Sequence, residues 1–171
     1  MSARAARAVL AAVAALLLGG CALLAEPSRI ALGTPEAQVL ATLGRPTAQY
    51  PATDGQPARL QYSYEPAGQR VFNIDLDAQG RVARVEQALE EGRFARHIQP
   101  NHWRRADVLR EYGPPARIEA VHNFTGQIWV WRYAVGPNWR LLFIDVDPQG
   151  VVRGWSLGDE NLADRLEPAS R

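Results

Sequence analysis

The sequence predicts an α+β fold made of two tandem units, each with helices packed on one face of a three-stranded antiparallel sheet. Three observations predict it. A set of residues recurs about seventy positions apart. Each copy begins with apolar residues at helical spacing and continues with segments in which apolar and polar residues alternate. The chain has 171 residues, of which 47% are hydrophobic and 22% charged, a composition typical of a globular protein of one or two small domains.

The duplication is visible in three groups of residues. Gly44-Arg45-Pro46 recurs as Gly113-Pro114-Pro115, and Tyr62-Ser63-Tyr64 recurs as Trp131-Arg132-Tyr133, both 69 residues later. The third group shifts by 70 residues and pairs Asp75, Asp77 and Gly80 with Asp145, Asp147 and Gly150. Because the order is preserved, the groups indicate an internal repeat.

The same elements are predicted in each copy. Val39, Leu40 and Leu43 mark a helix that Gly44 ends, and Val108, Leu109 and Tyr112 mark another that Gly113 ends. Alternation predicts strands over 60–64, 72–76 and 82–87, and again over 129–133, 142–146 and 151–157. The connector 90–101 is polar and partly helical around Phe94 and Ile98.

The phrase "NIDLDAQGRV" and its repeat "FIDVDPQGVV" allow two interpretations. Asp75, Asp77, Gln79, Gly80 and Glu86 fall at positions 1, 3, 5, 6 and 12 of a calcium-binding EF-hand loop. Such a loop needs a helix on each side, whereas these flanks alternate with the period of strands. The favoured interpretation is a hairpin turn whose glycine has a positive φ.

The N-terminus indicates a lipoprotein signal peptide over residues 1–20. Arg4 and Arg7 precede the apolar run 9–18, which is too short to cross a bilayer. Leu18-Gly19-Gly20-Cys21 then resembles a bacterial lipobox, in which Cys21 would be the lipid-attachment residue. The alternative is an ordinary secretory signal with an incidental cysteine. Ala22 and Leu23, rather than Asp, follow Cys21, which favours the periplasmic face of the outer membrane.

The remaining chain divides into four parts. Residues 21–29 are predicted to be a tether, 30–89 the first unit, 90–157 the connector with the second unit, and 158–171 a polar tail. Units this small bury little surface alone, so we expect the two sheets either to pack together or to run on continuously, and the chain to unfold in one transition. Nineteen basic and eighteen acidic residues leave a nearly neutral chain. We therefore expect no nucleic-acid partner, which would require a basic surface.

No catalytic or metal-binding constellation is predicted. Cys21 is used for the lipid, and His97, His102 and His122 occur without an HExxH or CxxC motif. No glycine-rich phosphate-binding loop occurs either. The sequence therefore predicts a protein that is not an enzyme, with no cofactor and no small-molecule substrate.

The order of motifs resembles the SmpA/OmlA family of BamE-like outer-membrane lipoproteins. The first copy supplies "IALGTPEAQVLATLGRP", "YSY" and "VFNIDLDAQGRV", and the second "IQPNHWRRADVLREYGPP", "WRY" and "LLFIDVDPQGVV". The second copy departs from the family in having Asn101-His102-Trp103 where Gly-Met-Thr is usual. The resemblance implies a non-enzymatic accessory of outer-membrane β-barrel assembly or envelope integrity, with a protein partner in the envelope. The tandem also resembles secreted β-lactamase-inhibitor proteins, so a periplasmic inhibitor or ligand-binding lipoprotein is the alternative.

One sheet face of the second unit is unusual. The strands of an antiparallel sheet with one solvated face should alternate apolar and polar residues, as the first unit does with Asn73, Asp75 and Asp77 opposite Phe72, Ile74 and Leu76. In the second unit, the face opposite Trp129 and Leu142 is also apolar and carries Ile128, Val130, Arg132, Leu141 and Phe143. Either the first unit or the connector covers this face, or it is a partner-binding surface with Arg132 as a polar anchor.

Overall fold

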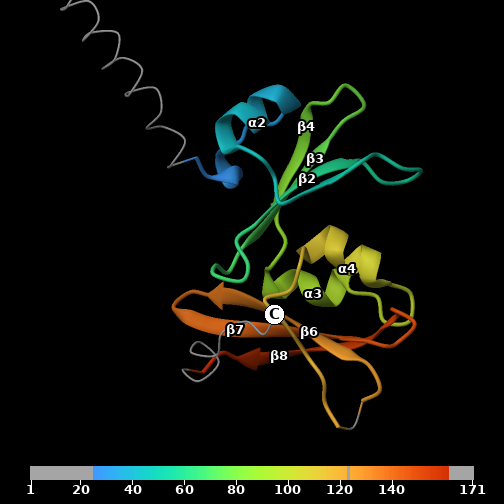
Figure 1. The fold of residues 1–171 in the computed structure, drawn as a ribbon. Helices are drawn as coiled ribbons and strands as arrows, with labels where there is room; N and C mark the ends of the chain where they lie inside the picture. The colour runs from blue at the N-terminus through green and yellow to red at the C-terminus, as the bar shows by residue number, and fades with distance from the viewer. Residues whose placement is uncertain (1–24, 123, 162–171) are drawn as a thin grey trace, which may run out of the picture.

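The computed structural model describes residues 25–122 and 124–161, and in them it contains two four-stranded antiparallel sheets (Figure 1). The first unit comprises the 3₁₀ helix η2 (Pro27–Arg29), α2 (Glu36–Leu43), β1 (Ala48–Tyr50), β2 (Ala58–Ser63), β3 (Val71–Leu76) and β4 (Val82–Gln87). The second comprises α3 (Glu91–His97), α4 (Arg105–Tyr112), β5 (Arg117–Glu119), β6 (Gln127–Val135), β7 (Asn138–Val146) and β8 (Val152–Asp159). Strand order is β1-β2-β3-β4 in sheet 1 and β5-β6-β7-β8 in sheet 2.

The prediction of three-stranded sheets is wrong, because each sheet has a fourth strand. The additional strands, β1 and β5, follow the Gly-x-Pro segments and pair antiparallel with β2 and β6. Each has only three residues. A segment that short cannot display alternation, and its pairing with a longer neighbour is what makes it a strand.

The glycines that end α2 and α4 are confirmed as helix terminators. Gly44 has φ 77° and ψ −162°, and Gly113 has φ 69° and ψ −170°. The φ is positive, but the extended ψ places both residues outside the left-handed helical region, in one that essentially only glycine occupies.

The hairpin interpretation of the repeated phrase is confirmed. In the first unit the Gly80 N–H donates to the Asp77 carbonyl, and Asp77 Oδ1 accepts the N–H groups of Gln79 and Arg81. Asp147 Oδ1 likewise accepts the Val151 N–H. Strands, not helices, flank both turns. The second aspartate of each phrase therefore closes a turn by bonding to the backbone ahead of it.

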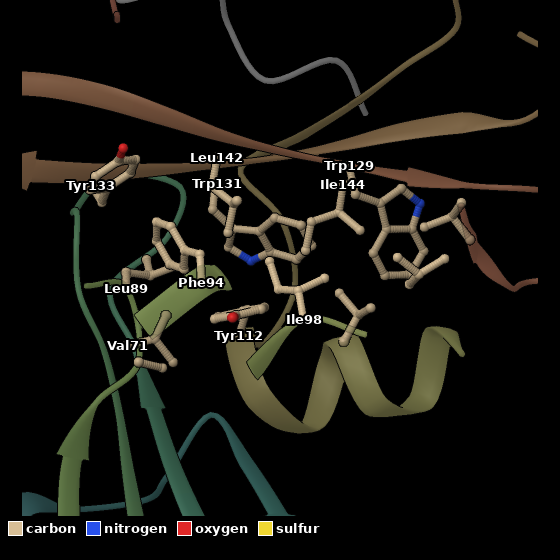
Figure 2. Close-up of a cluster of buried hydrophobic side chains, with 14 residues drawn as sticks. Val71, Leu89, Phe94, Ile98, Tyr112, Trp129, Trp131, Tyr133, Leu142 and Ile144 are labelled. Atoms are coloured by element: carbon tan, nitrogen blue, oxygen red, sulfur yellow. The ribbon is translucent and has the colours of Figure 1, made fainter. Parts of the chain in front are cut away.

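Two hydrophobic clusters form the core. The smaller packs Val39 of α2 against Leu60, Ile74 and neighbouring residues of sheet 1. The larger lies between sheet 2 and helices α3 and α4, and Figure 2 shows Phe94, Tyr112 and Trp131 facing one another within it. The Phe94 and Tyr112 rings meet edge to face at 5.9 Å. Val71 of β3 also belongs to this larger cluster, so the core of the second unit extends into the first.

Helix α4 lies between the two sheets, with sheet 1 above it and sheet 2 below it in Figure 1. Val108 and Tyr112 face the larger core, whereas the backbone and Glu111 contact the second face of sheet 1. The expectation of helices on only one face is therefore wrong for sheet 1, since its own α2 and the neighbouring α4 cover opposite faces. The sheets do not run on continuously; they are joined through this helix.

Candidate functional site

The most distinctive feature of the described residues is a buried charged interface between the units. Three polar residues of sheet 1 that alternation places opposite its core, Gln61, Asn73 and Asp75, are at most 3% exposed. The sequence predicts a solvated face here, but α4 covers it. Burial of polar groups requires partners, and the helix supplies them.

The last turn of α4 accepts hydrogen bonds from sheet 1. The Leu109 carbonyl accepts from the Tyr50 hydroxyl at 2.9 Å, the Arg110 carbonyl from Arg59 Nη1 at 2.9 Å, and the Glu111 carbonyl from Asn73 Nδ2 at 2.8 Å. Carbonyls in the last turn of a helix generally lack intrahelical partners, although the Leu109 carbonyl also accepts the Gly113 N–H at 2.8 Å. Sheet 1 therefore caps α4, and Arg59 places a positive charge where the helix dipole favours one.

Six charged side chains form a closed ring of ion pairs around this contact. We call them the charge ring: Arg59, Asp75, Arg84, Glu86, Arg93 and Glu111. Arg59 Nε lies 2.6 Å from Asp75 Oδ1, and Asp75 Oδ2 lies 2.8 Å from Arg84 Nη2. Arg84 contacts Glu86 at 2.9 Å, and Glu86 contacts Arg93. Arg93 lies 3.8 Å from Glu111, which returns to Arg59 at 2.8 Å. The ring alternates in sign and unites β2, β3 and β4 with α3 and α4.

The pKa shifts follow from this pairing. Burial alone would raise the pKa of Asp75, but its hydrogen bonds and ion pairs with Arg59 and Arg84 outweigh burial and hold the pKa below its ordinary value. Burial alone would lower the pKa of Arg59, yet Asp75 and Glu111 raise it. Burial and the nearby Arg93 lower the pKa of His97. Arg59 and Asp75 therefore stabilise each other's charged forms.

A cleft of about 200 Å³ opens beside the ring. Its walls include Trp103, Asp107 and Arg110 of the second unit, Gln56 and Pro57 of the first, and the ring members Arg59, Asp75, Arg84 and Glu111. Asp107 accepts the Arg104 N–H, and the Arg110 guanidinium stacks 5.2 Å over the Tyr50 ring and donates to the Pro57 carbonyl. These charges are thus engaged with groups of the protein itself, and the arrangement fixes the two units relative to each other.

A second contact between the units, the clasp, consists of Glu65, Arg132 and Glu160. Glu65, in the loop between β2 and β3, accepts the Arg132 backbone N–H at 2.7 Å, and the Pro66 carbonyl accepts from Arg132 Nη1 at 2.9 Å. Arg132 Nε donates to Glu160 at 2.6 Å, and its guanidinium lies 5.3 Å from the Trp139 ring centre. Burial, opposed by Arg132 and reinforced by the charge of Glu160, raises the pKa of Glu65 to about 8.

The five predicted partner-binding residues lie together on one face of sheet 2. Val130 pairs with Phe143 across β6 and β7, and Arg132 pairs with Leu141. Val130 is 0% and Leu141 2% exposed, although neither belongs to the two hydrophobic clusters, whereas Ile128, Arg132 and Phe143 are half-buried. A side chain built at Gly158 would meet the Phe143 ring at 2.9 Å, so this ring covers the glycine backbone of β8.

The remaining sequence-derived residues are placed as follows. Cys21 and the signal peptide lie outside the described residues. His97 lies 3.8 Å from Glu111, and His102 is exposed. Asp75, at the first calcium position, is bound by Arg59 and Arg84. Within residues 25–122 and 124–161, no cluster of three or more His, Cys, Asp or Glu side chains could hold a metal ion. No described helix has the length and apolar character to cross a membrane.

Sequence reasoning did not predict a role in joining the units for the following residues: Arg59, Gln61, Glu65, Glu86, Arg93, Glu111 and Glu160. Alternation along β2 does place Arg59 and Gln61 opposite Leu60 and Tyr62. It does not reveal that this face is buried, because the covering helix belongs to the other unit, about fifty residues later in the chain.

Comparison with known proteins shows no family. No family model matches the chain, and no curated protein matches it. Among solved structures, the chain is similar to a DUF4309 family protein, YjgB, from Bacillus subtilis, with 14% sequence identity and a TM-score of 0.31 over 74% of this chain and 78% of that one. A similarity at this level supports no conclusion about fold or function, so the functional argument depends on the sequence and on the structure of this chain.

Proposed function

We propose that the protein is a lipid-anchored lipoprotein on the periplasmic face of the outer membrane, acting as a non-enzymatic accessory in outer-membrane β-barrel assembly or envelope integrity. The observation that carries the proposal is Leu18-Gly19-Gly20-Cys21 directly after an apolar run of signal-peptide length. Two or three acyl chains on Cys21 would hold the protein on the bilayer, since each buried methylene contributes about 0.8 kcal/mol.

The structure supports a binding role through its rigidity. Charged groups at the interface are engaged in the charge ring and in the caps of α4. The clasp joins the two units at a second place, through Glu65 and Arg132. A scaffold whose units keep a fixed geometry loses little conformational entropy when a partner binds. The role in barrel assembly follows from the sequence resemblance alone and is part of the proposal.

The anchor is tested by Cys21→Ala. Cells expressing the full chain, with and without the change, are fractionated, and the protein is followed by immunoblot. We expect the wild type in the outer-membrane fraction and the variant in the periplasm, since the thiol is the acylation site. A variant that remains wholly in the membrane fraction would contradict lipid anchoring.

The partner is tested by affinity capture from solubilised envelopes with wild-type protein and Ile128→Asp. Ile128 is half-buried, so its exposed part is available to a partner, whereas Val130 and Leu141 are not exposed. Recovery of barrel-assembly components with the wild type, and their loss with a variant of unchanged melting temperature, supports the proposal. Recovery of a single soluble enzyme instead would favour the inhibitor alternative.

A further inference from the structure

The chain is fixed to the first unit very soon after the predicted lipid-attachment residue. The Glu26 carboxylate forms two hydrogen bonds with the Arg70 guanidinium, at 2.9 and 3.0 Å. Arg70 itself is held 5.3 Å from the Tyr64 ring centre and 5.6 Å from that of Phe72. The predicted tether of residues 21–29 is therefore docked from Glu26 onward.

The segment after Glu26 continues along the first unit. Pro27 is buried, and Ile30 packs against the smaller hydrophobic cluster. The Gly33 N–H then donates to the Val82 carbonyl at 2.7 Å, so the chain runs beside β4 until α2 begins. These contacts leave five residue steps between Cys21 and the fixed position of Glu26. At about 3.4 Å per step, that segment spans at most about 17 Å.

The surface beside this docked segment has a distinct composition. It is formed by η2, the loop 31–34 and the outer side of α2, which we call the α2 face. Leu32 is 70% exposed there, the largest exposure among the described large hydrophobic side chains. Residues 27–43 contain one base, Arg29, and one acid, Glu36, so the α2 face has no net charge, and the exposed residues of α2 are Ala37, Gln38, Ala41 and Thr42.

We propose that the α2 face lies against the bilayer surface, with Leu32 as its apolar contact; the inference rests on the lipid anchor of the proposed function. A lipid on Cys21 restricts the docked segment to the vicinity of the headgroups, and a surface without net charge that exposes a leucine can approach anionic headgroups without electrostatic repulsion. Sheet 2 lies on the other side of α4 from sheet 1 and so faces away from the bilayer, toward the periplasm (Figure 1).

The test uses the full chain, acylated in cells, purified in detergent and reconstituted into vesicles of phosphatidylethanolamine and phosphatidylglycerol. Because Cys21 is the one cysteine in the sequence and carries the lipid, a single introduced thiol can be labelled selectively. An environment-sensitive fluorophore is attached at position 32 in Leu32→Cys and, as a control, at position 118 in Ile118→Cys. Ile118 is 43% exposed and lies on β5 of sheet 2.

We expect a blue shift in fluorescence and quenching by spin-labelled lipid at position 32, and neither at position 118. Equal responses at the two positions, or a larger one at 118, would overturn the orientation while leaving the anchor intact. Failure of the protein to float with the vesicles would instead refute the anchor, and the orientation with it. The two failures are therefore distinguishable.

A second variant tests the role of the short tether. A flexible insertion of glycine and serine between Ala25 and Glu26 lengthens the segment after Cys21 without changing the α2 face. We expect the protein to float as before while the blue shift and quenching at position 32 diminish. An unchanged signal at position 32 would show that tether length does not set the orientation.

Discussion

At the scale of single residues, Asp75 illustrates how the surroundings decide the role of a side chain. Its place in the repeated phrase corresponds to the first ligand position in the disfavoured calcium interpretation, and strand alternation predicts a solvated side chain. In the structure it is 3% exposed and binds Arg59 and Arg84. Its counterpart in the second unit, Asp145, lies outside the charge ring, and burial raises its pKa. The repeat therefore preserves the residue but not its role.

Replacing Asp75 with asparagine should destabilise the protein strongly. The change leaves Arg59 buried without its main counter-charge, and breaking a buried pair costs about 3–5 kcal/mol. Urea unfolding followed by circular dichroism measures the loss. Asp54→Asn, on an exposed loop, is the matched control and should change the unfolding free energy by less than about 0.5 kcal/mol. Similar small effects of both changes would show that the charge ring is not stabilising.

Glu65 should make stability fall as pH rises. Its pKa is about 8 in the folded protein, against an ordinary value of 4.5, so the folded state holds the proton more tightly over this interval. The contribution of Glu65 proton binding to the stability of the folded state is complete below pH 4.5 and is lost as pH rises to about 8. His97, with a lowered pKa, acts in the opposite direction but is present in both proteins compared.

The comparison is between wild type and Glu65→Gln, which keeps an acceptor for the Arg132 N–H but cannot ionise. Melting temperatures are measured across this pH range. We expect the wild type to lose stability relative to the variant as pH rises from about 5 to about 8. Parallel melting curves at every pH would show that Glu65 does not titrate in this interval.

At the scale of elements, the two units share the same backbone conformation before their helices but form it with different residues. Gly33, with φ 80°, precedes α2, whereas Asn101, with φ 67°, occupies the loop before α4. The Gly33 and Asn101 N–H groups donate to Val82 and Val152, which are equivalent positions in β4 and β8. Asparagine tolerates a positive φ better than most residues. The departure from Gly-Met-Thr in the second copy therefore keeps the loop geometry.

The glycines that end the helices should not tolerate alanine. Gly44→Ala forces a side chain into a backbone region that glycine alone occupies readily, which costs about 1–3 kcal/mol. Gly113→Ala should cost more, because its new Cβ would also lie 3.0 Å from Gln61 Oε1, whose side chain is held by bonds to Asn73 and α4. Thermal unfolding measures both effects.

Gly92→Ala is the control for these two changes. Gly92 lies within α3, has no positive φ, and an added Cβ would meet nothing within 4 Å. Alanine there should leave stability unchanged or raise it by up to about 1 kcal/mol. If Gly92→Ala were as destabilising as Gly44→Ala, backbone strain would not explain the helix ends.

At the scale of the whole molecule, α4 makes the two units depend on each other. It contributes Val108 and Tyr112 to the larger core and its last carbonyls to sheet 1. Val71 of sheet 1 completes the same core. Separating the units would expose Gln61, Asn73 and Asp75 without their partners, so we expect cooperative unfolding.

The tryptophans allow a direct test of this coupling, because all five lie after residue 100, in the second unit. Val39→Ala removes buried side-chain volume from the smaller core, in the first unit, and should destabilise the fold by about 2 kcal/mol. We expect the unfolding midpoint from tryptophan fluorescence to fall with the midpoint from circular dichroism. Val135→Ala, at a site 46% exposed, is the control. An unmoved fluorescence midpoint in Val39→Ala would show independent units.

Local patterns in the sequence were sufficient to predict the duplication, the helices, six of the strands and the two hairpin turns. Helical spacing, strand alternation and turn residues act over only a few positions, so they can be recognised without knowing the fold. The same patterns placed the five residues around Val130 on one face of sheet 2, as the register of β6 and β7 confirms. Partner binding by that face is still a prediction.

Tertiary structure alone decided the fourth strand of each sheet, the burial of the polar face of sheet 1 and the two contacts that join the units. Three-residue strands acquire their identity from a neighbour, and a polar face becomes buried only when another element covers it. The partners of Arg132 are 67 residues before it and 28 after it, and those of Arg59 are 16 and 52 residues away. Ion pairs over such separations depend on how the elements pack, for which the sequence has no local signal.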